Sequence, residues 1–335
     1  MKYAKRIAAI LSLSLSLVLT GCSSDGSTMT ADEISSYPNE TIEFIVPAAA
    51  GALIDIPTRS VVELLNKSTD SQSVVVNMSG ASQITGTAEA FNRGGTGYTV
   101  LTCAPAGVML QPLMVELSYS IEDFRHIALL TPGDVNVVVT NSTSELTTWE
   151  ALVEKIESGE RLTWSASNQG GMGHLAALQV LNELGLEAEF IPFSGSSEGI
   201  AALLGDHIDF YVTDRSDAVP RVESGQINAL LTLSDTATSD LPDVPAGDDI
   251  GVYGMECFIG YYSLAVHKDT PDEVVDYLKT NIDLALQTEE YQAYLDSANF
   301  DSVPILTEEE VTDILLSESQ ELEKIIANLQ FTVEE

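Results

Sequence analysis

Basic residues are scarce in this 335-residue chain, which has 14 Lys and Arg against 51 Asp and Glu. The formal net charge of −37 argues against nucleic acids and anionic membrane surfaces as partners, because their phosphates repel a strongly acidic protein. The acidic residues are spread along the whole sequence, which is typical of a solvated acidic surface rather than of an acidic tail.

Cysteine and histidine are also rare, with three Cys and four His in the chain. The histidines lie far apart in the sequence, at His126, His174, His207 and His267. None has the spacing to another His or Cys that a metal site needs, so we predict neither a metal nor a cofactor. Cys103 and Cys257 could pair in an oxidising compartment, but we expect two buried free thiols.

Long apolar runs are absent except near the N-terminus. There, three basic residues precede an apolar stretch at 7–19, which is too short to span a bilayer and ends in Leu-Thr-Gly before Cys22. This pattern is typical of a bacterial lipoprotein signal, and its removal leaves a net charge of −40. We predict a signal peptide at residues 1–21, an extracytoplasmic lipid anchor on Cys22 and a flexible tether at 22–36.

Short β-branched runs alternate with amphipathic stretches along the rest of the chain. We expect strands at residues 41–46, 73–77, 98–102, 135–140, 161–165, 189–191, 208–213 and 259–266. We expect helices at 55–66, 87–92, 149–158, 173–184, 197–204, 217–223, 271–286, 289–296 and 307–328. This alternation predicts an α/β fold with mostly parallel sheets flanked by helices, and the length favours two domains.

Within this pattern, Thr147 and Glu150 have the spacing of a capping box for the helix at 149–158. Asp55 stands where it could cap the helix at 55–66. The loop before it, at 46–55, has small side chains that would let backbone amides approach a ligand. An ordinary strand-to-helix turn remains the alternative, since the loop is poor in glycine and lacks the lysine of a P-loop.

Two further strand-to-helix junctions carry polar residues. The junction at 165–174 combines hydroxyls, amides and glycines before a helix, and it can donate hydrogen bonds to a carboxylate. His174 shares a helix face with Leu178 and Leu181, which favours a packed histidine over a catalytic base. The junction at 192–198 repeats the pattern of proline, small residues and glycine. Ser165, Ser194 and Ser196 have no G-x-S-x-G setting, and no G-x-G-x-x-G is followed by a ribose-binding acid, so we predict that the protein is not an enzyme.

Taken in order, these segments resemble the substrate-binding proteins of tripartite tricarboxylate transporters, the Bug family of periplasmic solute-binding proteins. The resemblance begins at Tyr37-Pro38 and continues to the C-terminal helices. Residues 97–101 resemble the family's "DGYTLL" strand, residues 165–174 its "YASSGNGSPQH" turn, and residues 241–245 its "LPDVPT" turn.

The resemblance implies a two-domain clamshell of the type-II periplasmic-binding architecture, present as a monomer. Residues 37–137 and 256–335 would form one domain, with 138–255 inserted as the second. Family members bind carboxylates largely through backbone amides and hydroxyls. Here the family's "AAGGGTD" loop has lost two glycines and its hydroxyl, so an acid with an apolar end fits the sequence as well as citrate does.

The resemblance also implies ligand contacts from both domains. The first domain would contribute Ala48, Ala49, Gly51, Ala52, Asp55, Ser82, Gln83, Thr102 and Cys103. The second domain would contribute Ser165, Ser167, Asn168, Gly170, Gly171, His174, Phe193, Ser194, Thr213 and Asp214.

We therefore expect a lipoprotein that captures a small carboxylate and delivers it to membrane transporter subunits. Two alternatives stay open from the sequence. One is the ligand-binding module of a sensing system, and the other, less favoured, is a secreted α/β hydrolase.

Overall fold

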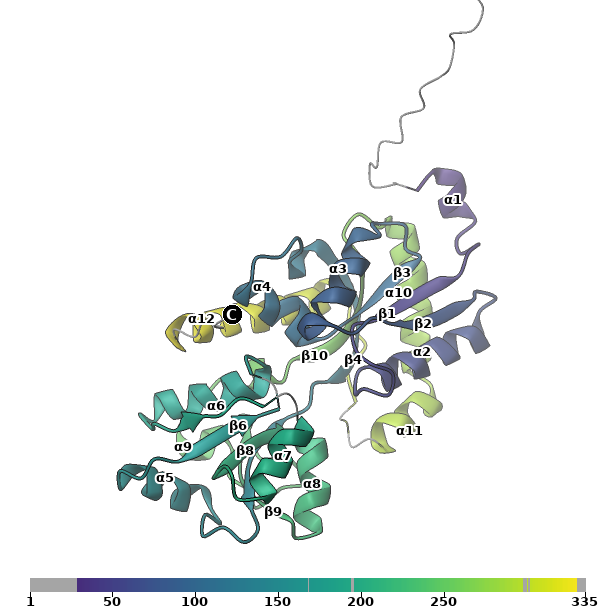
Figure 1. Cartoon of the computed structure of the whole chain (residues 1–335). Helices are drawn as coiled ribbons and strands as arrows, with labels where there is room; N and C mark the ends of the chain where they lie inside the picture. The colour runs from purple at the N-terminus through teal and green to yellow at the C-terminus, as the bar shows by residue number, and fades with distance from the viewer. Residues whose placement is uncertain (1–28, 168, 194–195, 298–299, 301, 330–335) are drawn as a thin grey trace, which may run out of the picture.

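The computed structural model describes residues 29–167, 169–193, 196–297, 300 and 302–329. It contains two five-stranded sheets, each flanked by helices (Figure 1). The first sheet has the order β2-β1-β3-β10-β4, with β1 (Ile42–Val46), β2 (Ser73–Asn77), β3 (Thr99–Cys103), β4 (Phe124–Pro132) and β10 (Tyr261–His267). The second has the order β7-β6-β8-β5-β9, with β5 (Asn136–Asn141), β6 (Thr163–Ala166), β7 (Glu189–Phe190), β8 (Phe210–Asp214) and β9 (Ile227–Leu233).

The two sheets share one plan. In the first sheet β10 runs antiparallel to its neighbours β3 and β4, and β1, β2 and β3 are parallel. In the second sheet β5 runs antiparallel to β8 and β9, and β6, β7 and β8 are parallel. Four strands of each sheet therefore point the same way and one is reversed. This confirms the predicted two-domain α/β fold and shows that each sheet is mixed.

Helices cover the faces of both sheets. The principal ones are α2 (Asp55–Ser68), α3 (Ile84–Asn92), α5 (Trp149–Glu157), α6 (Met172–Glu183), α7 (Ser196–Leu204), α8 (Arg215–Glu223), α10 (Asp272–Leu286), α11 (Glu289–Ser297) and α12 (Glu308–Leu329). Shorter ones are α1 (Ala31–Ser35), α4 (Gln111–Met114) and α9 (Gly247–Ile250). Single turns lie at η1 (Ala81–Gln83), η2 (Ala106–Leu110), η3 (Ile121–Asp123) and η4 (Met255–Phe258).

Three local predictions need correction. The capping box at Thr147 and Glu150 is wrong, because Thr148 caps α5 by accepting a hydrogen bond from the Ala151 amide at 3.2 Å. The prediction of a flexible tether at 22–36 is wrong for its last residues, because Ala31–Ser35 form α1, which has a capping box of Thr30 and Glu33. Ile34 of α1 also packs against the apolar cluster of the first domain. Strands β4 and β9 were not predicted.

The chain crosses between the sheets twice, at residues 133–135 and again at 234–260. The two crossings contact each other, since the Gly133 amide donates to the Gly260 carbonyl at 2.8 Å. A Cβ on Gly133 would lie 2.0 Å from the Ile259 carbonyl oxygen, so only glycine fits this contact. We propose the domain boundaries at these crossings. Asn136 then belongs to the second sheet, where β5 pairs with β8, rather than to the first domain.

The C-terminal helix α12 joins the two domains. It packs along β4 of the first sheet and reaches α6 of the second domain (Figure 1). Its buried Leu315 lies in one apolar cluster together with Leu101 of the first sheet and Trp164 of the second. The two domains therefore share a continuous core on the α12 side of the molecule.

Candidate ligand-binding cleft

A cavity of about 90 Å³ lies between the two sheets. Its lining consists of Gln83, Ala104, Pro105, Ala106, Asp134, Asn136, Met172, Asp214, Phe258, Ile259 and Tyr262. These residues come from the chain after β3, the end of β8, the start of α6, both crossings, the beginnings of β5 and β10, and η1. Ligands of open α/β sheets bind outside the carboxyl ends of the strands, and this cavity occupies that position between the domains.

Four polar side chains line the cavity without a hydrogen bond to any other described residue: Gln83, Asn136, Asp214 and Tyr262. The Oε1 atom of Gln83 is fully buried, and Asn136 is only 8% exposed. Buried polar groups are almost always paired, because an unpaired one costs about 1–3 kcal/mol. Donors and acceptors of this kind are therefore available to a ligand.

Asp134, also in the lining, is already satisfied. Its Oδ2 accepts from the Ser216 amide at 2.9 Å, and its Oδ1 accepts from Arg215 Nε at 3.4 Å. Arg215 reaches Asp240 as well, at 3.2 Å. Asp134 thus ties the first crossing to the start of α8 and has a structural role.

Asp214 differs from Asp134 because it has no donor of its own. Its side chain is exposed, and α8 begins after it without a side-chain cap. Desolvation by the surrounding protein, followed by repulsion from the carboxylates of Asp134 and Asp217, raises the pKa of Asp214 to about 6. Burial and then Asp214 itself also raise the pKa of Tyr262. Tyr262 comes from the first sheet and Asp214 from the second, so the two domains present them to the same space.

The N-terminus of α6 supplies the positive end of this cavity. Its N-cap is Gly171, which offers no side-chain oxygen, and Met172 in its first turn lines the cavity. Unpaired amides and the helix dipole at such a terminus bind anions. The loop before it is held by His174, whose Nδ1 accepts from the Gly170 amide at 2.8 Å.

His174 itself is packed, as predicted. Its ring stacks on Phe190 with centroids 4.1 Å apart and lies 5.3 Å from Trp164. Burial lowers its pKa to about 4, so the imidazole is neutral at physiological pH. His174 therefore positions the α6 loop from behind and does not line the cavity.

The loop at 47–55 is held by Asp55, which is 1% exposed. The Asp55 carboxylate accepts from the Gly51 amide at 2.7 Å, from Arg59 Nε at 2.8 Å and from Asn77 Nδ2 at 2.8 Å. Burial alone would raise the pKa of Asp55, but the bonds from Arg59, Gly51 and Asn77 together lower it. The predicted capping role is wrong: Ile54 is the N-cap of α2, and Asp55 closes the loop instead.

Comparison with known proteins agrees with this geometry. The model of the tripartite tricarboxylate transporter family receptor matches residues 58–331. The chain belongs to this family. Its members are extracytoplasmic periplasmic binding proteins, so the chain is a solute-binding receptor and not an enzyme. Among curated relatives, BugT of Bordetella pertussis is 28% identical over 260 residues, which cover 76% of this chain and 78% of BugT.

Solved structures of the family have the same fold. A TctC solute-binding protein from Polaromonas superposes with a TM-score of 0.71 at 25% identity, covering 88% of this chain and all of that one. MatC of Rhodopseudomonas palustris with bound malate has a TM-score of 0.71 at 19% identity, covering 87% and 100%. Another R. palustris protein, with adipate, has a TM-score of 0.73 at 19% identity, covering 88% and 99%. The last two establish the fold alone.

Within this family fold, the structure places the predicted contact residues in three groups. Gln83 and Asp214 line the cavity, and Gly171 caps the helix that enters it. The loop residues Ala49, Gly51 and Ser82 are exposed, whereas Ala48 and Ala52 pack with Ala104 beside the cavity. Other predicted residues are not part of the cavity lining: Thr102, Cys103, Ser165, Ser167, Gly170, Phe193 and Thr213. Asn168 and Ser194 lie outside the described residues.

Several of the residues outside the cavity lining are buried or have structural partners. The Thr102 hydroxyl bonds to that of Thr58 at 3.1 Å, and both side chains are fully buried. Ser165 is also fully buried, and Thr213 donates to Asp217 at 3.3 Å. Cys103 is buried and free, as is Cys257, which confirms the prediction of two unpaired thiols. Burial raises the pKa of Cys103 to about 12.

The apolar replacements in the first loop do not enter the cavity. Leu53 packs against the core cluster of the first domain, and Ile54 is 3% exposed beside Val46 and Ala104. The expectation that they would favour an acid with an apolar end therefore has no support in the cavity lining. The lining residues that the sequence analysis missed are Ala104, Pro105, Ala106, Asp134, Asn136, Met172, Phe258, Ile259 and Tyr262.

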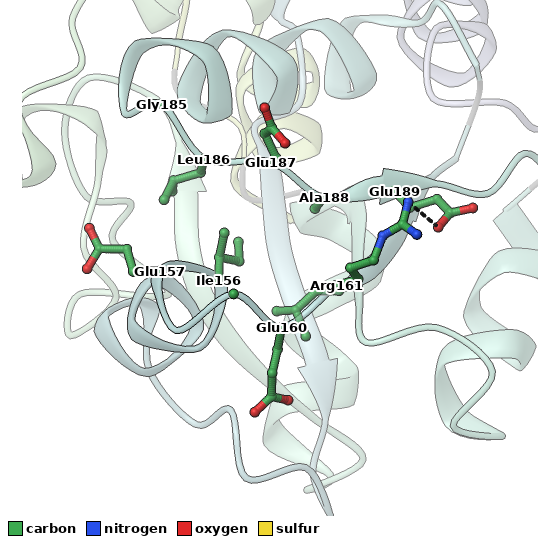
Figure 2. A pocket seen from close by; sticks show the side chains of 11 residues that line it. Ile156, Glu157, Glu160, Arg161, Gly185, Leu186, Glu187, Ala188 and Glu189 are labelled. Carbon is green, nitrogen blue, oxygen red and sulfur yellow. Dashed lines mark ion pairs between the residues drawn. The ribbon is translucent and has the colours of Figure 1, made fainter.

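A larger hollow of about 500 Å³ lies at the opposite end of the second sheet. Figure 2 shows Glu157, Glu160 and Glu187 pointing apart, whereas Arg161 points toward Glu189, with its Nη2 atom 3.9 Å from the Glu189 Oε2 atom. It lies at the amino ends of β6 and β7, away from the interdomain cleft. Its side chains do not converge on a ligand, so the smaller interdomain cavity is the better candidate. Among the described residues, no helix has the length and apolarity to cross a bilayer, and no cluster of metal-ligating side chains is present.

Proposed function

We propose that the protein is a lipid-anchored receptor that binds a small carboxylate in the interdomain cleft and delivers it to a tripartite tricarboxylate-type transporter. The observation that carries this proposal is the α6 N-terminus facing a cavity with unpaired polar side chains. Malate and adipate in two structural neighbours support carboxylates as the ligand class.

The ligand carboxylate would accept hydrogen bonds from the first amides of α6. A helix N-terminus suits this task in an acidic protein, because the dipole acts locally whereas distant surface acids are screened beyond roughly 10 Å. Gln83 and Tyr262 from the first domain and Asn136 from the second would complete the contacts. Closure of the two domains about the paired crossings would then bury the ligand and present a closed surface to the membrane subunits.

A thermal-shift screen of mono-, di- and tricarboxylates on ligand-stripped protein tests the binding step. A ligand at 100 times its Kd adds about 2.7 kcal/mol of stability, which a melting curve resolves. We expect at least one acid to raise the Tm, and Gln83→Ala to reduce that shift. Gln72→Ala is the matched control, since Gln72 is exposed and directly precedes β2, at the end of the first sheet opposite the cleft. If no acid raises the Tm, the proposed ligand class is wrong.

The lipid anchor is tested separately. Cys22 lies outside the described residues, and its modification rests on the sequence pattern. We expect the mature N-terminus in a bacterial host to carry the mass of a diacylglyceryl group. Cys22→Ser should release the protein from the membrane fraction, and membrane retention of that variant would contradict the anchor.

A further inference from the structure

We propose that the segment from Met29 to Tyr37, which contains α1, is a clamp that shortens the membrane tether and keeps the first domain next to the lipid surface. The second domain would then lie on the far side of the first. This inference rests on the proposed lipid anchor at Cys22 and adds an orientation to it. It starts from the docking of α1, which lies inside the segment that the sequence predicts as a tether.

The clamp is held against the first domain by apolar contacts. Met29, Ile34 and Tyr37 pack against the apolar cluster of that domain. The Thr30 hydroxyl accepts from the Glu33 amide at 3.3 Å, and the Glu33 carboxylate accepts from the Thr30 amide at 2.7 Å, which closes the first turn of α1. A helix of five residues is not stable by itself, so docking on the domain is what keeps α1 folded.

Tyr37 fixes the end of the clamp on two separate elements. Its hydroxyl donates to the Gly97 carbonyl at 2.8 Å, just before β3. Its ring lies 5.0 Å from the ring of Tyr98 and 5.4 Å from the ring of Tyr277 in α10. The chain is therefore attached to the folded domain from Met29 onward, and not only from the start of β1.

The position of Met29 sets the reach of the tether. Only residues 23–28 lie between Cys22 and Met29, and at full extension this stretch would span at most about 25 Å. If the chain were undocked as far as Tyr37, the same upper limit would be about 50 Å. The clamp therefore halves the largest possible distance between the lipid anchor and the first domain.

The clamp lies at the end of the first domain that is opposite the cleft. It precedes β1 and contacts the chain before β3, whereas the cavity begins after the carboxyl end of β3, at Ala104. Figure 1 shows α1 at the end of the first domain that is farthest from the second domain. A short attachment at this end keeps the first domain near the bilayer.

Electrostatic repulsion favours the same orientation. The chain is strongly acidic, and Asp32, Glu33 and Glu40 are exposed close to the attachment. An anionic bilayer repels such a protein over roughly 10 Å at moderate ionic strength. The lipid anchor holds one end of the receptor at the surface, and the repulsion keeps its sides away from it. The cleft would then remain open to the transporter subunits.

Energy transfer to a lipid dye tests the orientation in the full lipidated protein. The protein is placed in vesicles of phosphatidylcholine and phosphatidylglycerol that contain an acceptor-labelled lipid. A donor dye is attached through Glu40→Cys, beside the clamp, or through Glu223→Cys, at the end of α8 in the second domain. Cys103 and Cys257 are buried and do not compete for the dye. We expect about two-fold or more transfer from position 40 relative to position 223.

Two changes release the clamp in different ways. Ile34→Asp removes an apolar contact that holds α1, and an insertion of about eight Gly and Ser residues after position 28 lengthens the tether without changing α1. We expect each change to lower the transfer from position 40 about two-fold. Ile56→Asp is the matched control and should leave the transfer unchanged, since Ile56 is 47% exposed at the start of α2, at the opposite end of the domain.

The inference is overturned if positions 40 and 223 give equal transfer, or if either Ile34→Asp or the insertion leaves the transfer from position 40 unaltered. Hydrogen exchange on Cys22→Ser protein tests the clamp without the lipid anchor. The amides of Ile34 and Tyr37, which donate to Thr30 and Ile34, should exchange at least ten-fold more slowly than in the double variant with Ile34→Asp. Equal exchange overturns the clamp and leaves the lipid anchor standing. If wild-type protein does not bind membranes, the proposed anchor fails and the inference fails with it.

Discussion

Asp55 and Asp214 occupy similar places in the two domains and have opposite environments. Each lies at a junction between a strand and the following helix, α2 in the first domain and α8 in the second. Asp55 is buried and accepts three hydrogen bonds, which lower its pKa. Asp214 is exposed to the cleft without a bond, and its pKa is raised to about 6. The number of nearby donors, rather than burial alone, decides which form of each carboxyl is stable.

The comparison teaches that an aspartate at a strand-to-helix junction can have either of two roles. Asp55 holds its own loop in shape, so its donors come from that loop and from adjacent elements. Asp214 has carboxylates as neighbours, and burial together with these neighbours disfavours its ionised form. The two roles predict opposite effects of mutation, which the following experiments measure.

The largest effect should come from Asp55→Ala. This change leaves the Gly51 amide, the Asn77 amide group and Arg59 without their acceptor. We expect the free energy of unfolding to fall by about 2–4 kcal/mol at pH 7, measured by urea denaturation. Because the folded pKa is lowered, this contribution should be present above the unfolded value of 3.8 and be lost as pH falls through the folded pKa.

Asp276→Ala is the control for that experiment, since Asp276 is exposed on α10 and has no bond to another described side chain. It should change the free energy of unfolding by less than about 0.5 kcal/mol. A similarly small effect of Asp55→Ala would show that the loop does not depend on Asp55.

A smaller effect, of the opposite sign, should follow Glu318→Gln in α12. The Oε2 atom of Glu318 is buried without a partner, and burial together with Glu256 raises the pKa of Glu318 to about 7. Since the folded pKa is raised above 4.5, its contribution to stability is present below pH 4.5 and lost as pH rises through 7. We expect Glu318→Gln to stabilise the protein by about 2 kcal/mol at pH 8.

The free energy of unfolding of Glu318→Gln, measured at two pH values, distinguishes the effect of a buried charge from an effect of packing. The gain from Glu318→Gln should disappear near pH 4.5, where the wild-type side chain is protonated. Glu323→Gln, at an exposed position of the same helix, should show no such pH dependence. A gain that is equal at both pH values would point to packing.

The smallest effect should come from Asp214→Asn in the ligand-free protein. The folded pKa is about 6 against 3.8 in the unfolded chain, so the contribution to stability is lost as pH rises through 6. Solvent screening at this exposed position reduces the expected gain to about 1 kcal/mol at pH 8. Urea unfolding at pH 4 and 8 measures it. Destabilisation at pH 8 would mean that Asp214 has a structural role like that of Asp55.

The strands that could be predicted from the sequence are those with a run of β-branched residues, because such a run favours a strand by itself. Residues 73–77 form β2 with the predicted bounds, and β1 begins one residue later than predicted. The missed strands have different compositions. β4 contains Arg125 and His126 among its apolar residues, and β9 is rich in Leu and Ala, which favour helices. Both are strands because they pair with β10 and β5, a long-range effect that local patterns do not report.

The sequence carries less information about the lining of the cavity than about the fold, for a geometric reason. Thr102 and Cys103 end a strand and were predicted as contacts, but the cavity begins one residue later, at Ala104. Asp134 lies in the first crossing. Tyr262 lies in β10, the reversed strand that follows the second crossing. They become neighbours only when the two domains assemble. Motif position therefore indicates the strand-to-helix junctions but does not report which side chains face the cavity.

The bond between Gly133 and Gly260 has a mechanical consequence. Because this hydrogen bond joins the two crossings, a twist of one crossing would also turn the other. The contact leaves no room for a side chain on Gly133, so it has a fixed position in the molecule. Opening would then be a rotation about one axis, and two dyes on opposite lobes would report occupancy as a change in a single distance. A single interdomain distance would therefore be enough to describe the state of the receptor.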